Sequence, residues 1–182
     1  MAESFVFFIL KCFYLMLPAY FANMAPVIMK KIDLFAFPID FDRQLNKKPI
    51  FGRNKTFRGF VFGIIFSIAI SGLQFLLYSS DAFKNISFFD YQNWILLGFL
   101  LGLGALTGDL IKSFFKRRLN IEPGHKFVPF DQTDFVLGAL LFVTAFFDLT
   151  VKIFLTSLIM SFILHIIVNH IAFYLKIRKE KW

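Results

Sequence analysis

Long apolar runs alternate with short basic segments along this chain, and the runs have the length that a bilayer requires. A helix needs about 20 residues to cross the hydrocarbon core. Three runs meet or approach this length, at residues 5–29, 60–78 and 94–111. A fourth run, 135–175, is long enough for two spans with a turn near 148–152. We therefore expect an all-α, polytopic integral membrane protein with about five transmembrane helices, the fourth of them rather short.

The basic residues gather on one side of these predicted spans. Segments 30–58 and 112–134 and the tail after residue 175 together hold 17 of the 20 Lys and Arg residues. The positive-inside rule places such segments in the cytoplasm. We therefore expect a multi-pass protein of the plasma membrane with the N-terminus outside and the C-terminus in the cytoplasm. Any active site built from the basic segments would face the cytoplasm.

The composition agrees with this architecture and narrows the classes of function. Hydrophobic residues make up 58% of the chain, and 29 of its 182 residues are Phe, which is more than soluble domains carry. The net charge of +8 could suggest nucleic-acid binding, but the bases lie between apolar runs, where topology and anionic lipid explain them. We expect a single membrane-embedded domain over residues 1–182, a bilayer partner and no nucleic acid. The pattern leaves the oligomeric state open.

Polar residues gather where the third apolar run ends. Four of them share one helix face at positions i, i+3, i+4 and i+7: Asp109, Lys112, Ser113 and Lys116. A carboxylate near hydrocarbon is costly unless it has a partner or a purpose. The pattern favours a metal carboxylate followed by phosphate-binding cations, with Arg117 beside them. The alternative is a local pairing of Asp109 with Lys112, the remaining bases being membrane anchors.

Two further acids, Asp131 and Asp134, stand three residues apart at the start of the fourth span. Acids are favoured at helix starts as caps, so one of them can serve that purpose. Together with Asp109 they offer three carboxylates at one level of the membrane surface. Magnesium prefers such hard oxygen ligands, usually one or two carboxylates plus phosphates and water. The three carboxylates are therefore adequate to bind one or two Mg²⁺ ions.

Other polar residues are weaker candidates. The basic, glycine-flanked stretch 52–59 contains Lys55, Thr56 and Arg58 and could surround phosphates, although it lacks the spacing of a P-loop. Within the predicted spans, Asn23 lies in the first, while His165 and Asn169 continue a polar stripe in the last. These residues either form hydrogen bonds between helices or line a polar cavity open to the cytoplasm.

With these motifs in place, the chain resembles the CDP-archaeol synthase family, membrane cytidylyltransferases related to the CDP-diacylglycerol synthases. The resemblance covers nearly the whole chain. It is carried by LPAYFANMAP at 17–26, NKTFRG at 54–59, residues 104–118, PFDQTDFVLGAL at 129–140 and the His165–Asn169 pair. The wider synthase signature G-H-G-G is only partly present, because Gly124-His125 is followed by Lys126-Phe127.

The resemblance implies that CTP reacts with a dialkylglycerol phosphate, of the unsaturated archaetidic acid type, to give a CDP-lipid and pyrophosphate. This is a step of membrane phospholipid biosynthesis that uses Mg²⁺. The implied catalytic residues are Asp109, Lys116 and Asp131, and the implied metal ligands are Asp109, Asp131 and Asp134. The residues expected to bind the substrates are Lys55, Thr56, Arg58, Lys112, Ser113, Arg117, Asn23, His165 and Asn169.

Two alternatives stay open at this point. The first is the same reaction on phosphatidic acid, since the choice between ether and ester chains depends on apolar contacts that the sequence does not locate. The second is a small membrane transporter, which would place charges near the bilayer centre. Here the charges cluster at one interface instead, which favours the enzyme.

Overall fold

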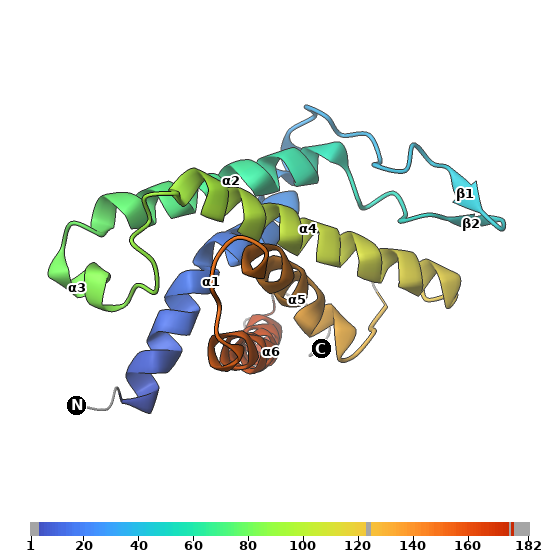
Figure 1. Ribbon diagram of the computed structural model, residues 1–182. Coiled ribbons are helices and arrows are strands. Elements are labelled where there is room, and N and C mark those ends of the chain that lie inside the picture. The colour runs from blue at the N-terminus through green and yellow to red at the C-terminus, as the bar shows by residue number, and fades with distance from the viewer. Residues whose placement is uncertain (1–3, 123–124, 175, 177–182) are drawn as a thin grey trace.

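The chain folds into a bundle of long helices with one small β-hairpin at its edge. Figure 1 shows the computed structural model, which describes residues 4–122, 125–174 and 176. In chain order the elements are α1 Phe5–Ile28, η1 Met29–Lys31, β1 Gln44–Leu45, β2 Lys48–Pro49, α2 Phe57–Leu77, α3 Asp81–Asn85, α4 Trp94–Arg118, α5 Phe130–Thr144 and α6 Val151–Tyr174. The helical prediction is confirmed for the bulk of the chain, whereas the hairpin was not predicted.

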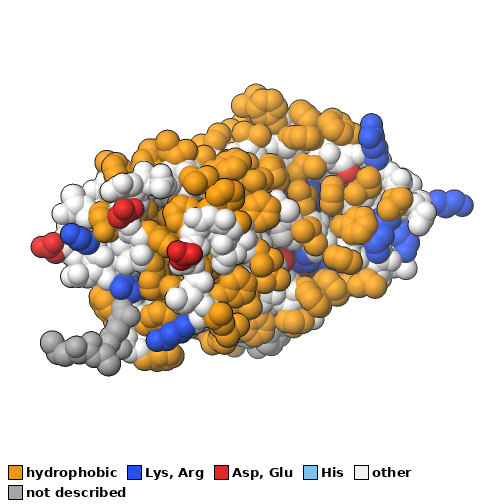
Figure 2. All heavy atoms as spheres, in the orientation of Figure 1, with side chains coloured by type: hydrophobic (Ala, Val, Ile, Leu, Met, Phe, Trp, Pro, Cys, Tyr) orange, Lys and Arg blue, Asp and Glu red, His pale blue; other side chains and the backbone are white. Residues whose placement is uncertain are grey.

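Within the part of the chain that the structure describes, four helices are long and apolar enough to cross a membrane, namely Phe5–Lys31, Phe57–Leu77, Trp94–Arg118 and Val151–Ile171. Hydrophobic side chains cover the face between the two ends of the molecule, while charged side chains gather at those ends (Figure 2). The fourth predicted span, which was expected to be short, is α5; it has only 15 residues, or about 22 Å of helix, which is less than the hydrocarbon thickness of about 30 Å. Helix length therefore supports four spans directly.

Helices α4 and α5 cross at three glycines. A Cβ on Gly138 would overlap the carbonyl oxygen of Gly104, and a Cβ on Gly108 would overlap that of Asp134. Without side chains at these positions the two backbones come into direct contact, as small residues allow in membrane helices. The crossing places the first turns of α5 beside the C-terminal end of α4, which is the part rich in charge.

The first helix tolerates two interior prolines. Pro18 and Pro26 both lie inside α1, which continues through them from Phe5 to Ile28. Interhelical hydrogen bonds join this helix to its neighbours: the Tyr20 hydroxyl pairs with Ser161 of α6, and Gln74 of α2 donates to the Tyr14 carbonyl at 2.6 Å. Polar groups inside a bundle need such partners because lipid offers none.

The segment between α1 and α2 is held to the end of α4 by a pair of reciprocal contacts. Strand β1 pairs antiparallel with β2. The Arg118 guanidinium donates to the carbonyls of Leu45, Lys48 and Pro49, and Lys48 returns a bond of 3.0 Å to the Arg118 carbonyl. The region predicted as a loop over 112–134 is shorter than expected, because α4 continues to Arg118 and α5 begins at Phe130.

Asp40 organises the rest of this segment. Its buried carboxylate accepts backbone N–H groups from Phe51 at 2.9 Å, Gly52 at 3.0 Å and Asp42 at 3.1 Å. Burial by itself raises the pKa of the Asp40 carboxyl, but these donors outweigh it and the pKa lies below its ordinary value. Because the pKa of Asp40 is lower in the folded protein than in the unfolded chain, these hydrogen bonds contribute their full stability at pH values above the pKa of the unfolded chain. This stability is lost as the pH falls through the pKa of the folded protein.

Substitution of Gly138 by Ala tests the α4–α5 crossing. Overpacking should lower the free energy of unfolding by about 1–3 kcal/mol, even though Ala is the better helix former. The change is measured as a lower melting temperature in detergent. Gly72→Ala is the matched control, because its Cβ would lie 3.0 Å from the Trp94 ring, which is a side chain that can shift. Equal melting temperatures for the two variants would contradict the close crossing.

Candidate active site

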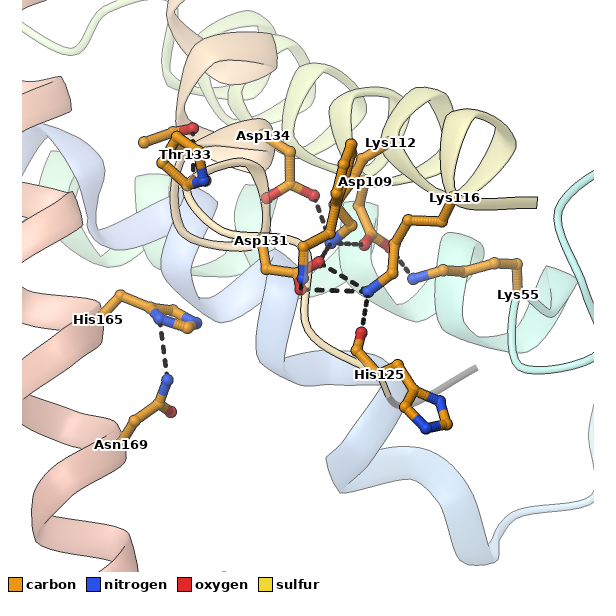
Figure 3. Close-up of polar contacts among 12 residues, drawn as sticks. Lys55, Asp109, Lys112, Lys116, His125, Asp131, Thr133, Asp134, His165 and Asn169 are labelled. Carbon is orange, nitrogen blue, oxygen red and sulfur yellow. Dashed lines mark hydrogen bonds and ion pairs between the residues drawn. The ribbon is translucent and has the colours of Figure 1, made fainter. Parts of the chain in front are cut away.

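Three carboxylates surround a single lysine where α4 and α5 meet (Figure 3). The ammonium nitrogen of Lys112 lies 3.1 Å from Asp109 Oδ1, 3.3 Å from Asp131 Oδ1 and 2.7 Å from Asp134 Oδ2. Asp109 and Lys112 face each other because they are three residues apart on one helix. The glycine crossing brings the other two acids from α5. The structure thus brings together the carboxylates that the sequence predicted.

Two more lysines complete this ion-pair network. Lys55 reaches in from the segment before α2 and donates to Asp109 Oδ2. Lys116 lies 3.1 Å from both oxygens of Asp131 and also donates to the His125 carbonyl. The Lys112 and Lys116 side chains are only 14% and 9% exposed. A buried charge is costly unless it is paired, so three lysines and three aspartates hold one another in place.

The two acids of α5 have different local roles. Asp131 Oδ2 accepts the backbone N–H of Phe127 at 2.7 Å, so Asp131 also fixes the turn that leads into the helix. Asp134 is 6% exposed, and its Oδ1 has no hydrogen-bond partner among the residues that the structure describes. The N-cap residue of α5 is Pro129, and no side chain caps that helix end, so the capping role that the sequence allowed for one of these acids is not observed.

A basic cavity opens beside the network. It has a volume of about 120 Å³, and its polar lining includes Lys55, Lys112, Ser113, Lys116 and Arg117. The Arg117 side chain is largely buried, and its Nε lacks a hydrogen-bond partner within the described part of the chain. An anion with several oxygens, such as a phosphate, would satisfy these donors. Four of the nine substrate-binding residues predicted from the sequence thus meet at one place, together with the predicted catalytic Lys116.

A larger cleft continues from this cavity. It measures about 620 Å³ and lies between the hairpin segment and the end of α4, with Gly52 and Arg117 lining both spaces. Asp40, Lys48 and Glu122 also face the larger cleft. The two spaces together can hold an elongated ligand whose phosphates lie at the lysines. Neither Asp40 nor Lys48 was predicted from the sequence, since neither stands in a recognisable motif.

The carboxylates have the right chemistry for a hard cation, but in this structure they surround an ammonium. Within residues 4–122, 125–174 and 176, no three His, Cys, Asp or Glu side chains are placed so that they could share a metal ion. The Lys112 ammonium lies between the three carboxylates instead. The unpartnered Asp134 Oδ1 and the all-oxygen donor set nevertheless suit Mg²⁺.

Two predicted residues of the segment 52–59 have structural partners. The Thr56 hydroxyl caps α2 by accepting the N–H of Gly59 at 3.2 Å. Arg58 turns away from the network and donates to the Ile32 carbonyl. The structure therefore brings Lys55 from this segment into the ion-pair network, and it places Arg58 on the neighbouring backbone.

The polar residues within the helices lie apart from the ion-pair network. His165 and Asn169 are hydrogen-bonded to each other at 3.0 Å on α6, and Figure 3 shows their side chains projecting from that helix. Asn23 is half-buried on α1 and is not among the residues that line the basic cavity. The stripe to which His165 belongs joins α6 to α1 through Ser161 and Tyr20. The hydrogen-bonding role that the sequence allowed for this stripe is therefore observed.

Comparisons with known proteins show the family to which the chain is similar. The family model for CarS-like CDP-archaeol synthases matches residues 5–182. The CDP-archaeol synthase of Pyrobaculum islandicum is 36% identical over 171 residues, covering 93% of this chain and 96% of its own length. That of Pyrococcus furiosus is 37% identical over 175 residues, covering 96% and 98%.

A solved structure has the same fold. It is described as an intramembrane enzyme for archaeal membrane lipids biosynthesis, and it matches with a TM-score of 0.73 at 31% identity. The match covers 88% of this chain and 94% of that one. Because the family model and the relatives both extend over nearly all of the sequence, the chain belongs to the CDP-archaeol synthase family.

Proposed function

We propose that this protein transfers the cytidylyl group of CTP to a lipid phosphate with two hydrocarbon chains and releases pyrophosphate. The observation that carries the proposal is the basic cavity beside Lys112, at the end of a membrane-crossing helix. The relatives are named for CDP-archaeol, which favours a dialkylglycerol phosphate of the archaetidic acid type as acceptor.

In the proposed reaction an oxygen of the lipid phosphate attacks the α-phosphorus of CTP. A new P–O bond forms there, the bond from the α-phosphorus to the bridging oxygen breaks, and pyrophosphate leaves with that oxygen. A phosphate monoester has a second pKa of about 6, so the attacking group is already anionic at neutral pH. No strong general base is needed, and catalysis rests on positioning and charge neutralisation.

The lysines of the ion-pair network supply much of that neutralisation. Lys55, Lys112 and Lys116 are held by carboxylates. Entering phosphates would share these ammonium groups, and Arg117 and Ser113 would add donors from the cavity wall. Because the site is already assembled, little reorganisation is required when charge develops on the leaving pyrophosphate.

Magnesium is proposed as the cofactor. One or two of Asp109, Asp131 and Asp134 would hold it together with substrate phosphates, since these residues supply hard oxygen ligands and Asp134 Oδ1 has no hydrogen-bond partner among the described residues. When bound, the ion would supply additional charge neutralisation at the phosphates.

The membrane topology is also a proposal. Five spans, with α5 as a short one, would leave the N-terminus outside and the C-terminus in the cytoplasm of a plasma-membrane protein. Lys and Arg side chains gather at the end of the molecule that carries the hairpin (Figure 2), and the positive-inside rule then favours a cytoplasmic active site.

Substitution of Asp109 by Asn tests the reaction centre. It leaves Lys55 and Lys112 without their shared carboxylate, and we expect transfer of labelled CMP from CTP to lipid to fall by about 100-fold or more. The control is Asp148→Asn, at the exposed turn between α5 and α6, which should keep wild-type activity. Wild-type turnover in a folded Asp109→Asn protein would remove this residue from the mechanism.

Cysteine labelling tests the orientation. In a Cys12→Ala background, single cysteines replace Arg43 and Glu122, which are exposed near the active site, or Lys84 at the opposite end. An impermeant thiol reagent added outside intact cells should label only the Lys84 position. Labelling at the Arg43 and Glu122 positions, with none at Lys84, would invert the proposed topology.

A further inference from the structure

Four phenylalanines form a ring cluster on the surface of the segment between α1 and α2. The Phe57 ring, at the first residue of α2, lies 4.9 Å from the Phe37 ring and 5.4 Å from the Phe41 ring, measured between ring centroids. The Phe35 ring meets Phe37 edge-on at 6.4 Å. Phe35, Phe37 and Phe41 are nevertheless 45%, 45% and 61% exposed. Contiguous exposed apolar surface of this kind marks a site of contact with another body.

Backbone hydrogen bonds fix the ring cluster at the level where α2 begins. The N–H of Phe57 donates to the Phe37 carbonyl at 3.1 Å, and the N–H of Arg58 donates to the Phe35 carbonyl at 2.7 Å. Figure 1 shows the segment that follows α1 running past this end of α2. Helix α2 has 21 residues, or about 31 Å of helix, which matches the hydrocarbon thickness of about 30 Å. The ring cluster therefore lies at a boundary between hydrocarbon and water.

The exposed apolar side of α2 continues into the ring cluster. Val61 and Ile65 follow Phe57 at steps of four, so the three side chains share one helix face. Val61 and Ile65 are both exposed, as expected of side chains that face lipid on a membrane-crossing helix. The rings therefore extend a surface that already contacts the bilayer.

The backbone at two of these rings has a conformation that phenylalanine disfavours. The φ angles of Phe35 and Phe41 are 54° and 51°, in the left-handed region that Gly, Asn and Asp adopt most readily. A bulky residue held there costs stability, so such positions persist only where other contacts offset the cost. Both side chains are about half exposed or more, which means that a large part of any such contact must come from outside the fold.

Basic side chains border the ring cluster along the chain. Lys30 and Lys31 precede it and Arg43 follows it, and all three are exposed. Lysine and arginine beside a membrane surface attract anionic lipid headgroups. Phenylalanine and leucine together with such bases are typical of segments that lie in the membrane interface. The charge pattern therefore favours a lipid surface over a water-soluble protein as the body that covers the rings.

We propose that Phe35, Phe37 and Phe41 insert into the interface of the bilayer beside α2 and anchor the segment between α1 and α2 to the membrane. The anchor also bears on the ion-pair network, because the N–H of Ile39 donates to the Lys55 carbonyl at 2.8 Å. Ile39 lies between two of the inserted rings, so the bilayer holds the backbone from which Lys55 reaches its carboxylate. The inference goes beyond the proposed function and holds whatever reaction the site performs.

Nitroxide spin labels test the insertion. In a Cys12→Ala background, Phe37→Cys and Phe41→Cys each carry one label, and the full-length protein is reconstituted in vesicles of dialkyl phosphatidylcholine and anionic dialkyl phosphatidylglycerol. Collisions with O₂, which dissolves in hydrocarbon, are compared with collisions with a water-soluble nickel chelate. We expect O₂ to collide more often at both positions, as it should at Ile65→Cys on the apolar side of α2.

The matched control is Leu45→Cys, an apolar position of the same segment that is 46% exposed but lies in the hairpin. Its label should collide mainly with the nickel chelate. Nickel collisions at Phe37→Cys and Phe41→Cys as frequent as at Leu45→Cys would place the rings in water and overturn the proposal. Few collisions with either reagent would also overturn it, because protein, either a second copy or another partner, would then cover the rings.

Hydrogen exchange tests whether insertion holds the segment in place. Phe41→Asn suits the left-handed backbone but removes the apolar side chain, whereas Phe41→Leu keeps one. In the same vesicles we expect the Ile39 amide to exchange about 10-fold faster or more in Phe41→Asn and close to the wild-type rate in Phe41→Leu, as followed by mass spectrometry. Wild-type exchange in Phe41→Asn would contradict the anchor, since a residue suited to the backbone would then replace the ring without loss.

Discussion

The rest of the site depends on the ammonium of Lys112, which lies among three carboxylates at the point where α4 and α5 meet. Charges this far from water are stable only as a matched set, and loss of one partner from a buried pair typically costs about 3–5 kcal/mol. The set can form only because Gly108 and Gly138 let the two helix backbones touch. The ion-pair network therefore depends on the direct backbone contact between the two helices at these glycines.

Contacts elsewhere in the fold hold the residues of this ion-pair network in position. Lys55 completes it from a segment that is anchored twice, by backbone N–H groups on Asp40 and by the Arg118 contacts with the hairpin. The same helix that carries Lys112 and Lys116 presents Ile111 and Phe115 on a neighbouring face. One helix end thus lies between a basic cavity and an apolar groove of about 430 Å³ that is lined by α4 and α5, which suits a reaction between a nucleotide and a lipid.

The sequence predicted the features that depend on local pattern. The long apolar runs match α1, α2, α4 and α6, and the spacing from Asp109 to Lys116 correctly predicts one helix face. Features that depend on tertiary contacts could not be predicted from the sequence. Lys55 and Arg58 lie three residues apart in one basic motif, yet one enters the network and the other binds a backbone carbonyl, because α2 begins between them. Strands of two residues carry no alternating pattern, so the hairpin left no signal.

The most direct test of cytidylyl transfer traces the α- and the γ-phosphate of CTP separately. Purified protein is given a long-chain dialkylglycerol phosphate, Mg²⁺ and CTP labelled at either the α- or the γ-phosphate. Cytidylyl transfer predicts that the α-label enters the lipid and the γ-label is released in pyrophosphate. Entry of the γ-label into the lipid, or no transfer of either label by folded protein, would contradict the central claim.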